Sequence, residues 1–110
     1  MKVALEVTKR VKASHRDVKH WFCSAVPETV TDYYTIIFHP TNLALIEAQL
    51  REGAFETPEE WMASMRTVFR NAFVYNRASD ETGRAVLAVA EAASSCFERE
   101  VLRLRGVVVL

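Results

Sequence analysis

The chain has 110 residues, of which half are hydrophobic and a quarter charged, with only three glycines and three prolines. This length suits one domain with one core, and so few turn residues argue against the many short strands of an all-β fold. Fourteen basic residues balance fourteen acidic ones, so no net positive field draws the chain to nucleic acid or to an anionic membrane. We therefore expect a single all-α domain over residues 1–110, without direct binding to nucleic acid or membrane.

No secretion signal or membrane span is evident in the sequence. Residues 1–5 lack the long apolar segment of a signal peptide, and no apolar run approaches the roughly 20 residues that cross a bilayer. The apolar end Val107-Val108-Val109-Leu110 is far too short for this role. Cys23 and Cys96 match neither a disulfide framework nor paired metal ligands. These features indicate a reducing compartment, the cytosol or the nucleus.

The first half of the chain predicts one helix and a long loop. From about residue 3 to residue 22, apolar residues recur at intervals near three, four and seven, with basic residues between them. A loop of roughly eighteen residues follows, longer than most connections in compact domains. Within it, a short helical turn over Tyr33–Ile37 begins at Thr31 or Asp32 and stops before Pro40. A long ordered loop in a small bundle is a common place for function.

Three further helices are predicted in the second half. One covers residues 42–51, is capped by Thr41 or Asn42, and ends before a glycine. Thr57-Pro58-Glu59-Glu60 is a strong start signal for a helix over 58–75, and a last helix is predicted over 80–105. The inward-facing positions expected in these last two helices are Trp61, Met62, Met65, Val68, Phe69, Ala72, Phe73, Val86, Val89, Ala90, Ala93, Cys96, Phe97, Val101 and Leu104.

Two sequence motifs say more than the helical pattern does. They are Asp32-Tyr33-Tyr34-x-Ile36-Ile37-x-His39-Pro40-x-x-Leu43 and Met65-x-x-x-Phe69-x-Asn71-Ala72-x-x-Tyr75-Asn76, with Leu50 and Phe55 between them. In order and spacing these residues resemble the bromodomain family, over at least residues 26–76. The resemblance implies a left-handed four-helix bundle with a long first loop and an acetyl-lysine cavity at one end. It also implies a nuclear protein that regulates transcription.

The resemblance implies roles for three polar or aromatic residues. Asn76 matches the asparagine whose side-chain amide donates to the acetyl carbonyl. Tyr33 matches the tyrosine whose hydroxyl holds a water bridging to the same carbonyl, and Tyr75 matches the aromatic beside the asparagine. Acetyl-lysine is a neutral amide with an apolar methyl group, and an apolar pocket with one oriented donor complements it. Without the resemblance, Asn76 is a helix C-terminal residue that tolerates a left-handed conformation, and the tyrosines are core aromatics.

The apolar side of the implied pocket departs from the family pattern. The chain lacks the proline of the family's Trp-Pro-Phe shelf, and the loop that follows is shorter. In the family, a gatekeeper residue lies beside the acetyl methyl group. Counting six residues on from Asn76 identifies it as Thr82, whereas aligning Phe97 with the family's last-helix aromatic identifies it as Val86. The candidates for this apolar wall are Phe22, Val26, Val30 and either Thr82 or Val86.

The same residues bear on functions of other classes. The altered loop between Phe22 and Val30 also fits a bromodomain-like fold that has lost acetyl-lysine binding and acts as an interaction or scaffold domain. A collapsed or acid-filled cavity beside the asparagine would favour that alternative. His39 precedes a proline and has no evident catalytic partner, and no Gly-rich phosphate loop is present, so we expect no enzyme and no cofactor. His20 and Cys23 lack further metal ligands nearby, so no metal site is expected.

The partner implied by the resemblance is an acetylated peptide, from a histone or from another acetylated protein. We expect the domain to work as part of a larger protein or complex.

Overall fold

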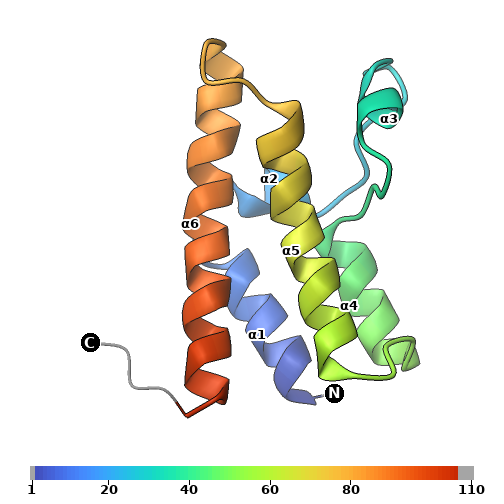
Figure 1. The fold of residues 1–110 in the computed structure, drawn as a ribbon, viewed down its shortest axis with the longest axis vertical. Coiled ribbons are helices and arrows are strands. Elements are labelled where there is room, and N and C mark those ends of the chain that lie inside the picture. The colour runs from blue at the N-terminus through green and yellow to red at the C-terminus, as the bar shows by residue number, and fades with distance from the viewer. Residues whose placement is uncertain (1, 107–110) are drawn as a thin grey trace.

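The computed structural model describes residues 2–106, and within that range it contains only helices and their connections, with no strand. An all-α helical bundle, as predicted, is therefore confirmed. Its elements are α1 (Lys2–Lys12), α2 (Val18–Phe22), α3 (Tyr33–Ile36), α4 (Leu43–Glu52), α5 (Pro58–Tyr75) and α6 (Glu81–Leu104). Figure 1 shows α1, α4, α5 and α6 forming the bundle, with α3 and the loop between α5 and α6 at one end. The apolar residues 107–110 lie outside the described residues.

None of the helices in residues 2–106 has the length and apolar character needed to cross a membrane.

The helix predicted over residues 3–22 is two separate helices, so this prediction is wrong in its continuity. Between α1 and α2, the Ser14 hydroxyl donates to the Val11 carbonyl at 2.6 Å, and His15 Nδ1 accepts from the Asp17 N–H at 3.1 Å. Short polar side chains that bond to the nearby backbone compete with the helical hydrogen bonds. The break turns the chain, and Val18 begins α2 on a new axis (Figure 1).

The other three helices follow the sequence signals closely. α5 has the predicted bounds, and α4 and α6 each differ from theirs by one residue at either end. Thr57 Oγ1 accepts from the Glu60 N–H at 3.2 Å, and Asn42 Oδ1 accepts from the Leu45 N–H at 2.9 Å, so both side chains cap their helices. Gly53 ends α4 with a φ of 70°, a conformation that favours glycine.

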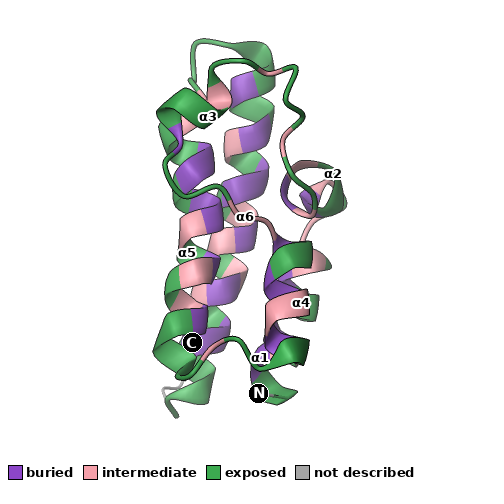
Figure 2. Cartoon of the chain, turned by 90° about the vertical axis from the view of Figure 1, so that its right-hand side faces the viewer, coloured by how far each residue is buried: buried purple, intermediate pink, exposed green. Residues whose placement is uncertain are grey.

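Aromatic residues form the centre of the core. Figure 2 shows the buried sides of the helices turned toward one another, and Trp61, Phe69 and Phe97 are among the largest fully buried side chains. The Phe97 ring centroid lies 5.6 Å from that of Trp61 and 6.4 Å from that of Phe69. Phe22 of α2 meets Phe69 edge to face at 6.3 Å. This cluster ties α2 to the long helices α5 and α6.

Two residues predicted to face inward are about half exposed instead, Phe73 at 48% and Leu104 at 49%. Phe73 follows the buried Ala72, and one step along a helix turns a side chain about 100° away from its neighbour. Leu104 is the last residue of α6. The apolar pattern predicted the stripe correctly but extended it too far at its edges.

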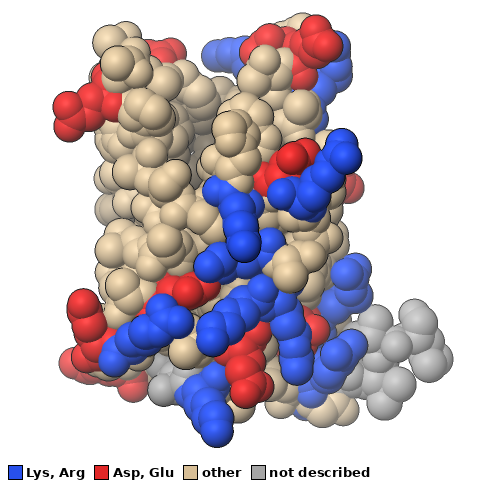
Figure 3. Space-filling model, turned by 180° about the vertical axis from the view of Figure 1, so that it is seen from behind, with Lys and Arg blue, Asp and Glu red and all other residues tan. Residues whose placement is uncertain are grey.

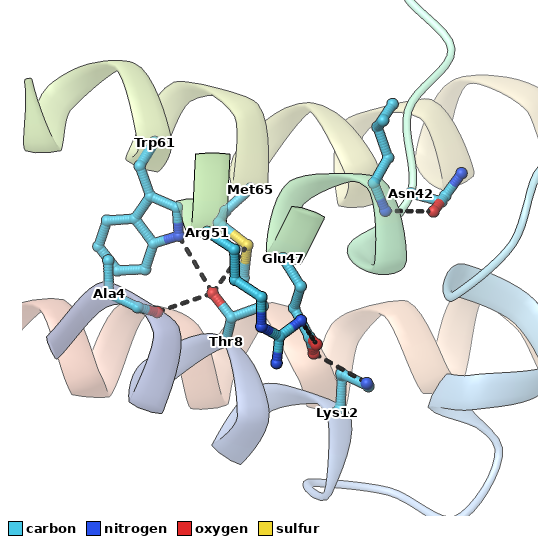
Figure 4. A network of polar contacts seen from close by, with 9 residues as sticks. Ala4, Thr8, Lys12, Asn42, Glu47, Arg51, Trp61 and Met65 are labelled. Carbon is cyan, nitrogen blue, oxygen red and sulfur yellow. Dashed lines mark hydrogen bonds and ion pairs between the residues drawn. The ribbon is translucent and has the colours of Figure 1, made fainter. Parts of the chain in front are cut away.

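The outer side of α1 is charged and its inner side is held by a buried polar contact. Figure 3 shows lysine and arginine atoms gathered on the rear face, where α1 and α2 lie. On the inner side, the Trp61 Nε1–H donates to Thr8 Oγ1 at 3.1 Å, and the Thr8 hydroxyl donates to the Ala4 carbonyl at 2.8 Å (Figure 4). Because Thr8 is fully buried, this chain satisfies polar groups that would otherwise be costly to bury. It fixes α1 against α5.

Candidate binding site

A cavity of about 580 Å³ lies where the loop before and after α3 meets the end of α5 and the start of α6. The structure places all eight residues predicted from the sequence around this one cavity. They are Phe22, Val26, Val30, Tyr33, Tyr75, Asn76, Thr82 and Val86. Residues distant in sequence, from α2 to α6, therefore meet at one end of the bundle.

Asn76 follows the last residue of α5 and caps the helix. Its backbone is extended, with φ −89° and ψ 151°, so it does not adopt the left-handed conformation that a plain capping role suggested. Its side-chain Nδ2 donates to the Ala72 carbonyl at 3.0 Å, and its backbone N–H donates to the same oxygen. An amide NH₂ has two hydrogens. One of them therefore anchors the amide, and the second is available to a molecule in the cavity.

The tyrosines close the long loop onto α5. The ring centroid of Tyr33 lies 4.9 Å from that of Tyr75 and 5.2 Å from that of Tyr34, both in edge-to-face arrangements. The Tyr75 hydroxyl donates to Asp32 Oδ1 at 2.7 Å, and the Tyr34 hydroxyl donates to the Val26 carbonyl at 2.5 Å. Asp32 directly precedes α3, but its side chain makes no capping bond there. Its carboxylate instead joins the loop to the end of α5.

Both cavity-lining tyrosines keep their protons at neutral pH. Burial, with a smaller effect of Tyr34, raises the pKa of the Tyr33 hydroxyl above its ordinary value of 10. The hydrogen bond to Asp32 raises the pKa of Tyr75 in the same direction. A raised phenol pKa means that the neutral O–H form persists to higher pH. Tyr33 can thus donate a hydrogen bond or accept one throughout the physiological range.

Asn71 holds the rest of the loop and was not predicted as a site residue. The residue is only 8% exposed, and its Nδ2 donates to the His39 carbonyl at 3.0 Å. A buried amide requires such a partner. The signal for this role was present in the sequence, because Asn71 interrupts the apolar stripe of α5 between Phe69 and Ala72.

Other residues of the cavity wall were missed. Val68 and Ala72 precede Asn76 by two turns and one turn on the same side of α5, so helical spacing alone could have identified them. Asp80, in the loop after α5, is exposed and gave no comparable signal. The remaining lining residues are His20, Trp21, Ser24, Ala25, Pro27 and Thr41.

Both candidate gatekeepers line the cavity, at different depths. Val86 is 4% exposed and Thr82 is exposed. Four residues apart, they lie on one side of α6, with Thr82 one turn nearer the end of the bundle. The structure thus places the valine inside the cavity wall and the threonine at the rim.

The loop of residues 77–80 is packed tightly on the first turn of α6. A Cβ atom on Gly83 would overlap the Arg77 carbonyl oxygen and lie 3.0 Å from the Arg77 nitrogen. Arg84 Nη1 donates to the Ala78 carbonyl at 3.0 Å. Only glycine at position 83 leaves room for this approach. The pair Gly83 and Arg84 therefore fixes the loop that carries Asp80 to the cavity rim.

In chemical terms the cavity is an apolar space with a few oriented polar groups. An anchored amide and a neutral phenol lie beside valine, alanine and phenylalanine side chains, and one carboxylate stands at the rim. Such a site suits a small neutral group that has one acceptor and one apolar end. No three His, Cys, Asp or Glu side chains within residues 2–106 gather closely enough to hold a metal ion.

Sequence comparisons relate the chain to known proteins. The family model described as Bromodomain matches residues 5–87. Over 55 residues the chain is 38% identical to Transcription factor GTE11 of Arabidopsis thaliana, a match that covers 50% of this chain and 9% of that protein. Over 79 residues it is 29% identical to SWR1 complex bromodomain subunit bdf1 of Schizosaccharomyces pombe, covering 72% of this chain and 13% of that protein. The chain spans only a small part of these relatives.

The fold is also similar to a solved structure, described as that of a bromodomain from human BAZ1A. The TM-score is 0.80 at 20% sequence identity, and the match covers 93% of this chain and 91% of that one. At this identity the likeness concerns the fold. The matched segment of the family, residues 5–87, includes every residue predicted for the site. The helical bundle and the match to the family model together show that the chain belongs to the bromodomain family.

Proposed function

We propose that this domain binds acetylated lysine side chains through the cavity beside Asn76. The observation that supports this most is the meeting of Asn76 and Tyr33, forty-three positions apart, over one mostly apolar cavity. The remaining N–H of the Asn76 amide donates to the acetyl carbonyl, and the Tyr33 hydroxyl holds a water that bridges to the same oxygen. Tyr75 positions Tyr33 through their ring contact.

The apolar residues shape the space for the acetyl methyl and the lysine stem. We propose that Val86, which is buried in the wall, lies beside the methyl group, and that Thr82 widens the entrance above it. Phe22, Val26 and Val30 cover the opposite side, in place of the family's usual shelf. Because Phe22, Val26, Val30 and Val86 carry no polar side-chain atoms, burial of the ligand's apolar surface against them contributes to affinity.

Discrimination against unmodified lysine follows from the lining. An ammonium group entering the cavity would shed its hydration without a buried carboxylate partner, at a cost of several kcal/mol. The acetylated side chain loses only the hydration of an ordinary amide and regains a hydrogen bond. Asp80, the one acid among the lining residues of the described chain, is exposed at the rim, where water screens its charge.

The setting of this activity is proposed from the relatives. One is named as a transcription factor and another as a bromodomain subunit of the SWR1 complex. We place this domain in the nucleus, as a single non-catalytic module within a larger chromatin-associated protein, where it binds an acetylated histone tail or another acetylated protein.

Replacing Asn76 by alanine is expected to weaken binding of an acetyl-lysine peptide by roughly 10- to 100-fold, the equivalent of losing one buried hydrogen bond. Calorimetric titration of wild type and variant with the same peptide measures this. Because Asn76 also caps α5, thermal unfolding of the variant must show that it is still folded at the titration temperature. Arg70→Ala, at an exposed position on α5, is the matched control and should keep wild-type affinity. Unchanged affinity in Asn76→Ala would contradict the proposal.

A scaffold function without acetyl-lysine binding is the second candidate, and Asp80 is the observation that favours it. If the cavity binds a cationic side chain of a protein partner, the unmodified lysine peptide will bind and Asp80→Asn will lose that binding. If the cavity takes acetyl-lysine, Asp80→Asn will change the affinity for the acetylated peptide by no more than about twofold, as expected for an exposed charge.

A further inference from the structure

The balanced net charge conceals an uneven distribution of charged residues. The first twenty residues contain six lysines and arginines but only two acidic residues, Glu6 and Asp17. α1 and α2 bring these residues to the rear face of the bundle, and Figure 3 shows basic side chains concentrated across the middle and lower part of that face. The expectation of no nucleic-acid binding rested on the sum of charges, which does not describe this face.

On the α4 side of α1, two cations share one hidden carboxylate. Glu47 Oε1 lies 2.8 Å from Lys12 Nζ, and Glu47 Oε2 lies 3.4 Å from Arg51 Nη1 (Figure 4). The Glu47 side chain is 9% exposed, whereas that of Arg51 is 54% exposed. The anion is covered by the bundle and the arginine faces solvent. The group has one more cation than anion and presents positive charge outward.

The α6 side of α1 repeats this arrangement. Glu100 Oε2 lies 3.0 Å from Arg10 Nη1, and Glu100 Oε1 lies 3.5 Å from Arg103 Nη1. The Glu100 side chain is 11% exposed, and the two arginines are 56% and 69% exposed. Each buried glutamate therefore orients arginine side chains at a fixed place on the surface. This reduces the side-chain entropy that they lose when they bind an anion.

Other exposed cations lie near the groups around Glu47 and Glu100. Lys9, Arg16 and Lys19 are exposed on α1, in the turn and on α2, and the Arg16 side chain is 91% exposed. Its nearest carboxylate is that of Asp17, with Arg16 Nε 3.7 Å from Asp17 Oδ2. The cations lie along convex helix surfaces, a shape suited to a row of phosphates on the outside of a polyanion.

We propose that this cationic face, formed by Lys9, Arg10, Lys12, Arg16, Lys19, Arg51 and Arg103, binds the phosphate backbone of duplex DNA without sequence preference. A duplex presents about one negative charge per 1.7 Å, and α1 alone is about 16 Å long, so several phosphates meet the face at once. Lysine and arginine contacts to phosphate need no base recognition.

Most of the face lies away from the cavity, and only its end at Lys19 of α2 adjoins the cavity-lining residue His20. The cavity is at the α3 end of the bundle, whereas α1 lies in the other half (Figure 1). Glu28, Asp32, Asp80 and Glu81 lie on or beside the two loops that form the cavity end, and Arg77 and Arg84 offset part of their charge. The cations of α1 attract DNA to the half of the bundle away from the cavity, so a peptide and a duplex can be bound together. The DNA contact does not depend on the proposed acetyl-lysine binding.

Fluorescence anisotropy with a labelled 30-base-pair duplex of arbitrary sequence, measured from 50 to 200 mM salt, tests this proposal. Wild type should bind, with an affinity that falls as salt rises. Lys9→Glu combined with Lys19→Glu should lower the affinity by about tenfold or more and reduce the salt dependence by about one unit per lysine. Asn76→Ala should bind the duplex as wild type does. The test of DNA binding is therefore independent of whether the cavity binds acetyl-lysine.

Arg70→Glu combined with Arg77→Glu makes the same change in net charge at exposed positions outside the face and is the matched control. It should retain duplex binding within about twofold if the contact is local rather than a matter of net charge. Equal losses in the two double variants would overturn the proposal. So would the absence of binding at 50 mM salt, or binding to vesicles containing phosphatidylserine in place of the duplex.

Discussion

Replacing Phe97 by alanine should lower the free energy of unfolding by about 3–5 kcal/mol, the range expected when a fully buried aromatic side chain is truncated. Phe97 has no exposed surface and contacts the rings of both Trp61 and Phe69. Arg66 lies over the same ring, 5.6 Å from its centroid. Truncation removes buried apolar area and leaves a cavity at the junction of α5 and α6, which the rigid aromatic neighbours cannot fill. Denaturant unfolding followed by circular dichroism measures the change.

Phe38→Ala is the matched control for this substitution. Phe38 is 84% exposed, so the same chemical change should alter the free energy of unfolding by less than about 0.5 kcal/mol. If Phe97→Ala destabilises the chain no more than Phe38→Ala does, the aromatic cluster is not the centre of the core.

Gly83→Ala is expected both to destabilise the fold and to weaken ligand binding. Alanine is normally the better helix former, by about 1 kcal/mol. Here the added Cβ would overlap the Arg77 carbonyl oxygen, which belongs to the backbone and cannot rotate away. We expect a net loss of about 1–3 kcal/mol, the cost of overpacking. Arg77 directly follows Asn76, so a shift of this loop also displaces the Asn76 amide, and affinity for an acetyl-lysine peptide should fall by roughly tenfold, or about 1.4 kcal/mol.

The sign of the stability change decides whether Gly83 has this role. A free helical position would become more stable with alanine, and such a gain would contradict the packing described for the loop. Gly53→Ala serves as the control, because Gly53 lies at the end of α4 with a φ of 70° and nothing within 4 Å of an added Cβ. It should cost about 1 kcal/mol of backbone strain and leave peptide affinity unchanged.

Local signals in the sequence predicted most of the helices, and the break after α1 shows where such signals fail. Capping by Thr57 and Asn42 and the stop at Gly53 depend on neighbours within four residues, so the sequence states them directly. Val11 and Val18 lie seven residues apart on either side of residues 13–17, however, and this helical spacing masked the backbone bonds of Ser14 and His15. Periodicity describes which side of the chain is buried, and it does not show whether the axis is continuous.

The sequence could identify a site residue where that residue matches a position of the family's motif or lies at helical spacing from one that does. Asn76, Tyr33 and the apolar wall were placed around one cavity, and the open choice between Thr82 and Val86 corresponds to two depths on the same side of α6. The bond from Asn71 to the loop and the close approach at Gly83 join segments that only the folded chain brings together. The positive charge of the α1 face was not predicted for the same reason. The net charge sums basic and acidic residues that lie on different faces of the folded chain.

The central claim is that the cavity beside Asn76 accepts acetyl-lysine and excludes lysine. Titration of the ¹⁵N-labelled domain with a pair of histone-tail peptides, identical except for acetylation of one lysine, tests it most directly by amide chemical shifts. The acetylated peptide should shift the amides of Asn76 and Val26, which line the cavity from two different segments, and the unmodified peptide should leave both in place. Equal shifts with both peptides, or shifts confined to residues outside the cavity, would contradict the claim.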